Sequence, residues 1–549
     1  MSHNFLLSLV NMVRFSILTG LVALTSVLTS FASAKGAATN TGIHASIDLR
    51  TLSQAKDTIF DHIISFIDDV KIPDVQLKGN KGYLIENSFH LSPANKLVNF
   101  YNDVSNNAVV FEADNLSATF HCGHFKLKEG FVQAKGHADV DLQRLKLQVG
   151  IGFTTQKLLD GRTLPAIKTV DVQFMISEQD IQVHLHGNVW SEFAGSFISF
   201  FKGPMIKLIE SSNQKAINIS LPTYVNTAIA NSNGSMNFVD PNWQLNVITP
   251  AAPKVTLDSL SLGIKGLFFD ERIGDYDTVR FPNMPFKNNT HLDTLQMFVS
   301  MQSLDSFFES YLDVHEGAGW YNETQLPHPL DFTLTTNDLN IMLPGMVNTY
   351  GKNKQVKLEY KVEDFGDFRS RFAKPYMIAT ATVNLRFWVV NQPGQEELAV
   401  ELNLYNITNK VFMNEKPDLR MSLMIGEFRL HGVEVVESRI GMLNPNTIRL
   451  KLNTVNSVIV TLTNIILQRF EVQIPNKMIG DLFHLSQLHL EYFDGYIYAG
   501  VTPVYMAPAN VPLHTVHDHV SANERAVHPD FFQMNDIVEY NGYDYQFIQ

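Results

Sequence analysis

An alternation of unusual length at residues 139–153, DVDLQRLKLQVGIGF, constrains this chain more than any other feature. Apolar side chains take every second position at Val140 and Leu142 and, after a one-residue slip, from Leu145 onwards. This pattern is typical of a strand with one buried face, and about fifteen residues extend roughly 50 Å, whereas ordinary strands have about 5–6 residues. We predict a long strand that wraps around an apolar interior, with a β-bulge at 143–144 that bends it.

The second half of the chain repeats this feature. Met421 and Ile425 share one phase and Phe428 and Leu430 the other, with a slip at 426–427. We expect a second bulged strand there. Gly150 and Gly152 in the first strand are expected to leave its outer face thin.

Four stretches have helical apolar spacing. Residues 52–70 form an amphipathic pattern bounded by Pro73, and 193–209 form a second, interrupted by Gly203-Pro204. A third helix is expected after Ser303, which we predict as its N-cap, and a fourth lies within 447–470. Together with alternating segments on both sides of a proline-containing connector at 241–256, these stretches give each half long strands and two helices.

The first 34 residues have the organisation of a secretory signal peptide. Arg14 precedes an apolar run, and Ala32-Ser33-Ala34 resembles a cleavage site. We expect a secreted, extracellular protein; the alternative is a membrane anchor. The single cysteine, Cys122, excludes an intrachain disulfide, and we expect it to be a buried small apolar residue. Six sequons permit glycosylation without arguing for it, at Asn115, Asn218, Asn233, Asn288, Asn322 and Asn406.

Charge and motifs exclude several functions. The net charge is −13, and residues 35–240 carry 18 basic and 20 acidic side chains, so most of the acidic excess lies in the second half. Nucleic-acid binding requires a basic surface, and we therefore exclude it. Nucleophile-elbow, phosphate-loop, zinc-protease and dinucleotide motifs are all absent from the sequence. We expect no catalysis and no cofactor.

Two groups of histidines contain metal-ligand types. His121-Cys122-Gly123-His124 has no second pair at a finger-like spacing, and in a strand His121 and Cys122 point to opposite faces. Four more histidines lie in the C-terminal segment, at His514, His517, His519 and His528. We interpret both groups as structural or surface histidines and predict no metal site.

The apolar helix faces have two interpretations. In the simpler one they pack on their sheets as ordinary core; in the other, helices laid along curved sheets leave an apolar tunnel that a lipid fills. The residues expected to line such pockets are Ile59, Ile63, Phe66, Ile67, Phe193, Phe197 and Phe200 in the first half and Phe307, Tyr311, Ile459, Leu462 and Ile466 in the second.

Several segments, in the same order along the chain, resemble one family. They include KIPD (71–74), GFVQAKGHADVDLQRLKLQVGIGF (130–153), NVITPAAPKVTLDSLSLGIKGLFFD (246–270), SLDSFFESYLDVHEGAGW (303–320), FEVQIPN (470–476) and QLHLEYFDGYIYAGVTPVY (487–505). The chain is similar here to bactericidal/permeability-increasing protein, lipopolysaccharide-binding protein and the cholesteryl ester and phospholipid transfer proteins, within the tubular lipid-binding superfamily. The resemblance covers about residues 42–505.

The resemblance implies an α+β fold, an elongated boomerang of two pseudo-symmetric domains joined by a central sheet. Each domain would be a highly curved antiparallel β-barrel with long amphipathic helices and an apolar lipid pocket. The expected units are a signal peptide (1–34), an N-terminal lipid-binding barrel (35–240), a connector with the central sheet (241–256), a C-terminal barrel (257–505) and a poorly ordered tail (506–549).

The implied activity is carriage or transfer of phospholipid-like or other apolar lipids, with lipids and a transient membrane or lipoprotein surface as partners. The alternative is an innate-immune pattern-recognition protein that binds bacterial lipopolysaccharide through a modest basic tip of the first domain. That tip would contain Lys126, Lys128, Lys135, Lys157, Arg162 and Lys168. The family's usual disulfide is absent because residues 161–217 contain no cysteine. A further alternative is an interaction protein that keeps the fold without a cavity.

Overall fold

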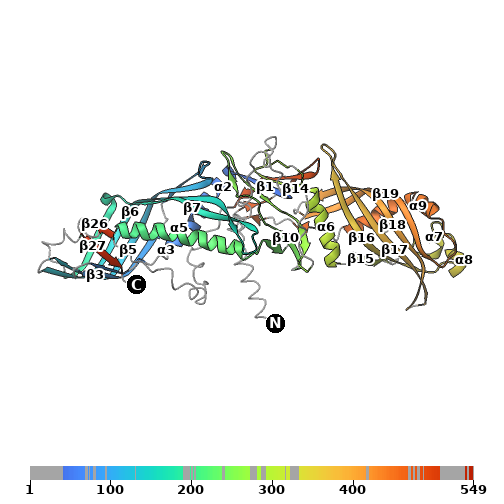
Figure 1. Ribbon diagram of the computed structural model, residues 1–549, viewed down its shortest axis with the longest axis horizontal. Helices are drawn as coiled ribbons and strands as arrows, with labels where there is room; N and C mark the ends of the chain where they lie inside the picture. The colour runs from blue at the N-terminus through green and yellow to red at the C-terminus, as the bar shows by residue number, and fades with distance from the viewer. Residues whose placement is uncertain are drawn as a thin grey trace.

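A computed structural model describes residues 41–188, 206–272, 292–321, 333–467 and 483–506 with short internal gaps, short pieces between these ranges, and the strands at 538–540 and 543–547. The molecule is elongated, with a large curled sheet at each end and a smaller sheet between them (Figure 1). The fold is therefore mostly sheet, with helices packed against it. The expected signal peptide lies outside the described residues.

The first sheet is antiparallel and has the order β26-β27-β2-β3-β5-β6-β7, with β4 paired to β5 and β8 paired to β6. Its strands are β2 (Val75–Leu77), β3 (Gly82–Ser92), β4 (Leu97–Asp103), β5 (Ala108–Glu129), β6 (Val132–Lys157), β7 (Thr163–Met175), β8 (Ile181–Asn188), β26 (Val538–Tyr540) and β27 (Tyr543–Phe547).

The second sheet has the order β15-β16-β17-β18-β19-β20 and is also antiparallel. Its strands are β15 (Ala318–Tyr321), β16 (Val356–Ser370), β17 (Met377–Gln392), β18 (Gln395–Glu415), β19 (Arg420–Ser438) and β20 (Val472–Gln473).

The central sheet, of order β11-β12-β1-β14-β24-β23, combines strands from distant parts of the chain. They are β11 (Lys254–Val255), β12 (Ser259–Ile264), β1 (Ile43–Asp48), β14 (Leu295–Ser300), β24 (Tyr496–Val501) and β23 (Leu488–Phe493). Two three-stranded sheets lie beside it: β13 (Phe268–Asp270), β10 (Trp243–Asn246) and β9 (Ser235–Asn237), and β21 (Lys477–Met478), β22 (Phe483–His484) and β25 (Val504–Tyr505).

The long strand predicted from residues 139–153 is part of β6, which has 26 residues. Its bulge is confirmed. Ala118 pairs with Leu142 but Leu116 pairs with Leu145, so β6 has an extra residue at the predicted slip. Arg144 there has a φ of 54°. On its other side, β6 pairs with β8 up to Leu142 and with β7 from Lys146. The bulge is thus the point at which β6 changes its neighbour.

The second predicted bulge is also confirmed. Lys410 pairs with Glu427 and Val411 with Ile425, which leaves Gly426 as the extra residue of β19. The outer face of β6 at its glycines is not thin, because Gly150 and Gly152 are both buried. A Cβ at Gly150 would lie 2.3 Å from the carbonyl oxygen of Val170 on β7. The glycine allows the two backbones to approach.

The described helices are α2 (Leu49–Gln54), α3 (Lys56–Asp68), α5 (Ile206–Ala230), α6 (Met301–His315), α7 (Thr336–Leu339), α8 (Met346–Tyr350), α9 (Pro445–Thr454) and α10 (Asn456–Leu467), with a 3-10 turn, η2, at Glu178–Asp180. The helix expected over 52–70 is therefore two helices, separated at Ala55. Ser303 does not cap α6: it is buried inside the helix, and its N–H donates to the hydroxyl of Ser300. The Gly203-Pro204 break lies outside the described residues.

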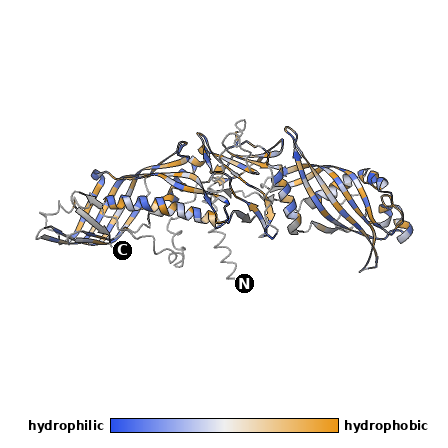
Figure 2. Ribbon diagram, in the orientation of Figure 1, coloured by the Kyte–Doolittle hydropathy of each residue, from blue (hydrophilic) through white to orange (hydrophobic). Residues whose placement is uncertain are grey.

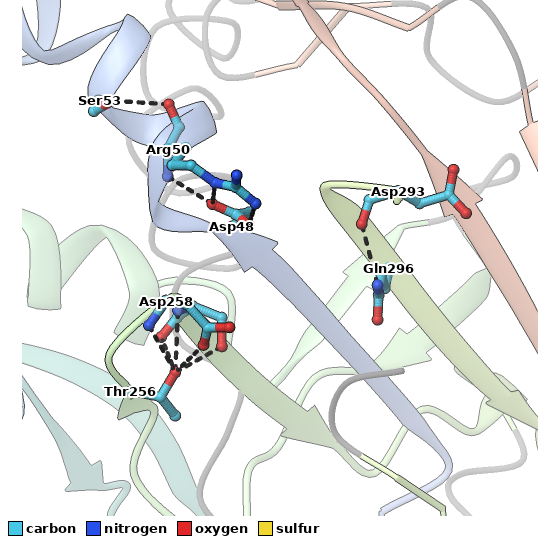
Figure 3. Close-up of polar contacts among 8 residues, drawn as sticks. Asp48, Arg50, Ser53, Thr256, Asp258, Asp293 and Gln296 are labelled. Carbon is cyan, nitrogen blue, oxygen red and sulfur yellow. Dashed lines mark hydrogen bonds and ion pairs between the residues drawn. The ribbon is translucent and has the colours of Figure 1, made fainter. Parts of the chain in front are cut away.

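Polar side chains organise the junction around the central sheet (Figure 3). Asp48 ends β1 and caps α2, accepting a hydrogen bond from the N–H of Arg50 at 2.8 Å. The Asn107 amide, at a positive-φ turn before β5, donates to Pro253 O at 2.6 Å and accepts from the Val255 N–H at 2.7 Å. This amide fastens the connector to the first sheet.

Two described strands lie near the end of the chain, within residues 506–549, where a poorly ordered tail was expected. β27 pairs with both β26 and β2, which extends the first sheet at its edge (Figure 1). In the sequence, Tyr543, Tyr545 and Phe547 alternate with polar residues, a pattern too short to stand out. Residues 507–537 lie outside the described part.

Each large sheet encloses its own apolar core. One core contains the inner faces of β3, β5, β6 and β7 with α3 and α5, and the other contains β16 to β19 with α6 and α9. The strands are striped with alternating polar and apolar residues along their length (Figure 2). Among the described residues, the helices lack the combination of length and hydropathy that crossing a bilayer requires.

Candidate functional site

The apolar interior of the first half lies between the first sheet and two helices. α5 runs along the sheet beside β7, and α3 contacts both α5 and strands β3 and β4 (Figure 1). Residues of both helices belong to the same buried cluster as the inner faces of β5 and β6. Only one face of each strand enters this cluster, as the alternation predicted.

The buried face of α5 contains one polar residue in an apolar stripe. Positions four apart bring Ile209, Asn213, Ile217, Leu221 and Val225 to one face, and all five are buried. Asn213 is fully buried, and neither its amide nitrogen nor its amide oxygen has a hydrogen-bond partner among the described residues. A buried polar group without a partner costs about 1–3 kcal/mol. This amide is therefore a candidate contact for the polar group of a ligand.

The second half has a comparable polar atom inside its core. Asn409 of β18 lies between the buried residues Ile407 and Val411 on the inward face of the strand. Its side chain is 2% exposed, and its amide oxygen has no partner among the described residues. Each interior thus contains a buried asparagine with unused hydrogen-bonding capacity.

A second asparagine of α5 fixes the helix on the sheet. The Asn226 amide accepts a hydrogen bond from the Ile167 N–H and donates one to the Ile167 carbonyl, both at 2.8 Å. Ile167 lies on β7, which pairs only with β6 among the described strands. The side chain therefore takes the place of a missing strand neighbour.

The second half uses the same contact twice. On α9, Asn453 bonds the N–H and carbonyl of Leu430 at 3.0 Å each. On α10, Asn464 bonds the same groups of Ile425 at 2.6 and 2.9 Å. Both target residues lie on β19, whose outer edge pairs with β20 only at Arg420 and Met421 in the described part of the chain. Helices thus close the free edge of the last long strand in both sheets.

The residues predicted to line a first-half pocket are only partly described. Ile59 and Ile63 of α3 are buried, 5% and 3% exposed, within the core. The side chains of Phe66 and Ile67, and all of Phe193, Phe197 and Phe200, lie outside the described residues. Ile59 and Ile63 thus face the interior, and whether they contact lipid remains a prediction.

In the second half, Phe307, in the middle of α6, belongs to an aromatic cluster. Its ring lies 4.6 Å from that of Trp243 and 5.0 Å from that of Phe268. Tyr311 also contacts Trp243, with ring centroids 5.5 Å apart. Ile459 of α10 is half-buried against the core, and the side chains of Leu462 and Ile466 lie outside the described residues.

The structure does not bring the six predicted tip residues together. Lys126 and Lys135 pair directly across β5 and β6, and Lys128 lies two residues along β5. Lys157 and Lys168, with Arg162, belong to the opposite end of β6 and to β7. Residues 135 and 157 are about 70 Å apart along a strand that rises ~3.3 Å per residue. Arg162 also pairs with Asp160 at 2.6 Å.

The single cysteine matches its expectation. Cys122 is fully buried on the inner face of β5, and burial raises the pKa of its thiol to about 12. His121 lies on the outer face, as the strand argument predicted, and its Nδ1 is 2.6 Å from an oxygen of Asp139. His137 and Asp139 are two residues apart in the sequence, as are His184 and His186, and this spacing places the members of each pair on one face of a strand.

The described sequons lie at the surface. Asn115 and Asn406 are exposed positive-φ residues within β5 and β18. Asn218 and Asn233 are exposed at α5 and just after it, and the Asn218 amide oxygen accepts from Thr169 at 2.7 Å. Asn288 and Asn322 lie outside the described residues.

Comparison with known proteins gives no family assignment. No family model matches the chain, and no curated protein matches it. Among solved structures, the crystal structure of lipopolysaccharide binding protein matches with a TM-score of 0.44 and 16% identity, covering 85% of this chain and 100% of that one. P47 from Clostridium botulinum A2 matches with a TM-score of 0.26 and 11% identity, covering 85% and 98%. Takeout 1 of Epiphyas postvittana matches with a TM-score of 0.23 and 16% identity, covering 32% and 92%. All three TM-scores are low, and these similarities carry no argument by themselves.

Proposed function

We propose that this chain is a secreted, non-enzymatic protein that carries or transfers phospholipid-like or other apolar lipids inside two sheet-and-helix domains. The observation that carries the proposal is Asn213, whose amide is fully buried in the apolar face of α5 with no partner among the described residues. A hydroxyl or protonated carboxyl group on a lipid would both donate a hydrogen bond to the amide oxygen of Asn213 and accept one from its N–H. An ester group would only accept. The acyl chain would lie along the surrounding apolar stripe.

The energetics favour exchange rather than irreversible capture. Each methylene group moved from water to an apolar site gains about 0.8 kcal/mol. A lipid taken from a membrane already lies in an apolar environment, so that term nearly cancels. Hydrogen bonds to the buried Asn213 amide then contribute to the choice of lipid. A lipid with no polar group at that position would leave the amide without a partner and would bind less tightly.

Asn213→Leu tests the proposal because binding and stability should change in opposite directions. Removing an unpartnered buried amide should leave the ligand-free protein as stable as the wild type or more so. The same change should reduce lipid that co-purifies with the protein, or that it extracts from phosphatidylcholine vesicles, by at least threefold. Native mass spectrometry measures the bound lipid, and denaturant unfolding measures stability.

Gln214→Leu is the matched control, because it makes a similar change at the next residue of α5, which is only half-buried. It should bind lipid like the wild type. Repeated isolation of wild-type protein that contains no lipid and extracts none from vesicles would overturn the proposed function. Equal binding by Asn213→Leu and wild type would remove Asn213 from the site.

Recognition of bacterial glycolipid is a second candidate, supported by three adjacent lysines on β5 and β6. Lys126 and Lys135 face each other across the strands, so their charges repel until an anion lies between them. Under this candidate, changing Lys126, Lys128 and Lys135 to Glu should abolish lipopolysaccharide binding. Under lipid carriage alone, the same changes should leave vesicle extraction unchanged.

A further inference from the structure

Five histidines gather on the outer face of the first sheet, away from its apolar core. They come from three adjacent strands: His121 and His124 from β5, His137 from β6, and His184 and His186 from β8. The pairing register explains the cluster. Asp139 on β6 pairs with His121 on one side and His184 on the other, and His137 pairs with His186.

Three of these residues hold ligand atoms close together. A ring nitrogen each from His137 and His186 and a carboxylate oxygen of Asp139 all lie within 4.8 Å of one another. Nε2 of His186 is 3.4 Å from Oδ2 of Asp139. Two ligands of one tetrahedral zinc ion, each about 2.0–2.1 Å from the metal, are roughly 3.3 Å apart. This pair is therefore already at the separation that coordination requires.

We propose that His137, His186 and Asp139 form a surface site for a divalent transition-metal ion of the zinc class. Two imidazoles and one carboxylate suit zinc, copper or nickel, whereas calcium and magnesium take mainly oxygen ligands. The imidazole rings of His137 and His186 are stacked with centroids 4.6 Å apart, so rotating these exposed rings brings their nitrogens towards a shared ion. Water completes the coordination.

His121 has a positioning role in this site. Its Nδ1 lies 2.6 Å from Oδ1 of Asp139, the oxygen that the metal does not use. This contact holds the carboxylate in place while Oδ2 stays directed towards His186. Partners that orient metal ligands in this way commonly change metal affinity by about 10–100-fold when removed.

The site links β6, which pairs with strands on both sides, to β8, which has fewer backbone hydrogen bonds to the sheet. β8 pairs only with β6 among the described strands, and only up to Leu142 of β6, where the bulge ends the pairing. His186 lies on β8 and the other two ligands on β6, so a bound ion would add a cross-link between them. Metal binding should consequently raise the thermal stability of the first half of the molecule.

The test uses the full chain and Zn²⁺, with Co²⁺ as a spectroscopic probe. Isothermal titration at pH 7.5 should show a zinc equivalent that His137→Ala/His186→Ala loses, with at least a tenfold drop in affinity for Asp139→Asn. Co²⁺ should give a visible absorption band in the wild type that is absent from the double variant. All the altered side chains are at the surface, and circular dichroism of the metal-free variants checks their folding.

Two controls separate this site from other histidines. His431→Ala removes an exposed histidine of the second sheet and should leave zinc binding intact. His514→Ala/His517→Ala removes two histidines of the C-terminal segment, and this variant should also bind one equivalent of zinc. The proposal is overturned if the wild type binds no zinc, or if the equivalent survives in the β6–β8 double variant. It is equally overturned if the C-terminal variant is the one that loses it.

Protons should compete with the metal at this site. A histidine ring nitrogen must be deprotonated to coordinate a metal ion, so protons and zinc compete for the same nitrogen atoms. Zinc affinity should therefore fall by at least tenfold between pH 7.5 and pH 5.5. A zinc affinity that does not change over this range would contradict imidazole ligation.

Discussion

The side-chain amide of Asn226 bonds both backbone groups of Ile167, at 2.8 Å each. One residue of a helix thereby occupies the position of a missing strand. Because the same geometry recurs between Asn453 and Leu430, it is a shared device of the two halves. The contact fixes each helix against a strand edge at this residue.

Asn226→Leu should destabilise the protein by about 2–4 kcal/mol, because it leaves an N–H and a carbonyl of Ile167 without partners. Asn226→Asp keeps the acceptor for the N–H but loses the donor, and its cost should be smaller. Urea unfolding followed by circular dichroism measures both. Asn231→Leu, at an exposed position just beyond α5, is the control. Equal stability of Asn226→Leu and this control would contradict the assignment.

Arg144→Val should destabilise the protein by roughly 1–3 kcal/mol, because a β-branched residue is strained at a φ of 54°. Arg144→Gly should be tolerated, since glycine adopts that conformation without strain. Both variants lose the ion pair with Asp180, so their difference isolates the backbone effect. Thermal unfolding that shows the two variants equally stable would exclude strain at the bulge.

The stability of the central sheet should depend on pH through His44. Burial lowers the pKa of this histidine to about 4, although Nδ1 lies 3.3 Å from the carbonyl oxygen of Pro285. The unfolded chain therefore binds a proton before the folded protein does. The contribution of neutral His44 to the free energy of unfolding is complete above pH ~6.5. Up to about 3 kcal/mol of it is lost as the pH falls towards 4.

His44→Gln should flatten that part of the pH profile, because glutamine cannot be protonated in this range. Unfolding free energies at pH 7.5, 6, 5 and 4.5 measure the effect. Other groups titrate equally in both proteins, so the difference between the two curves reports His44. Parallel curves from pH 7.5 to 4.5 would contradict the prediction.

Asp305 on α6 should affect the pH dependence of stability in the opposite direction from His44. Burial raises the pKa of its carboxyl to about 6, and Asp367, Glu309 and Asp364 raise it further by repulsion, while the Phe368 N–H donates to it at 2.8 Å. The folded state therefore binds the proton more tightly, and this contribution disappears as the pH rises through 6. Asp305→Asn keeps the acceptor and should stabilise the protein at pH 7.5 by about 1–2 kcal/mol.

At pH 4 the wild-type carboxyl is already protonated, so Asp305→Asn should give little gain there. Glu178→Gln is the control, because Glu178 is an exposed acid of the first half and is not one of the groups that raise the pKa of Asp305. Unfolding at the two pH values decides the matter. A gain for Asp305→Asn that is the same at pH 4 and pH 7.5 would rule out ionisation as the cause.

Local patterns in the sequence identified the strands and both bulges, because alternation and its slip are properties of a few neighbouring residues. Residues 139–153 predicted the bulge at Arg144, and 421–430 the bulge at Gly426. The change of partner from β8 to β7 was not predictable, since it depends on segments far away in the chain. For the same reason, local patterns could not show that Lys135 and Lys157 lie at opposite ends of β6. The sequence had predicted one tip that contained both.

The histidine cluster was missed for a related reason. His121-Cys122-Gly123-His124 stood out because its residues are contiguous, but in a strand its first two side chains lie on opposite faces. The cluster with His137 and His186 is assembled by the register between β6 and β8, to which a single sequence gives no access. Asn213 was likewise hidden, because one polar residue barely disturbs an apolar helical pattern.

The asparagines that close the free edges of β7 and β19 also tie helix docking to self-association. An uncovered strand edge is a template for pairing with another molecule. If α5 moves away from the first sheet, the edge of β7 and the apolar face beneath it become exposed together. Variants that weaken helix docking, such as Asn226→Leu, should therefore aggregate rather than remain as open monomers.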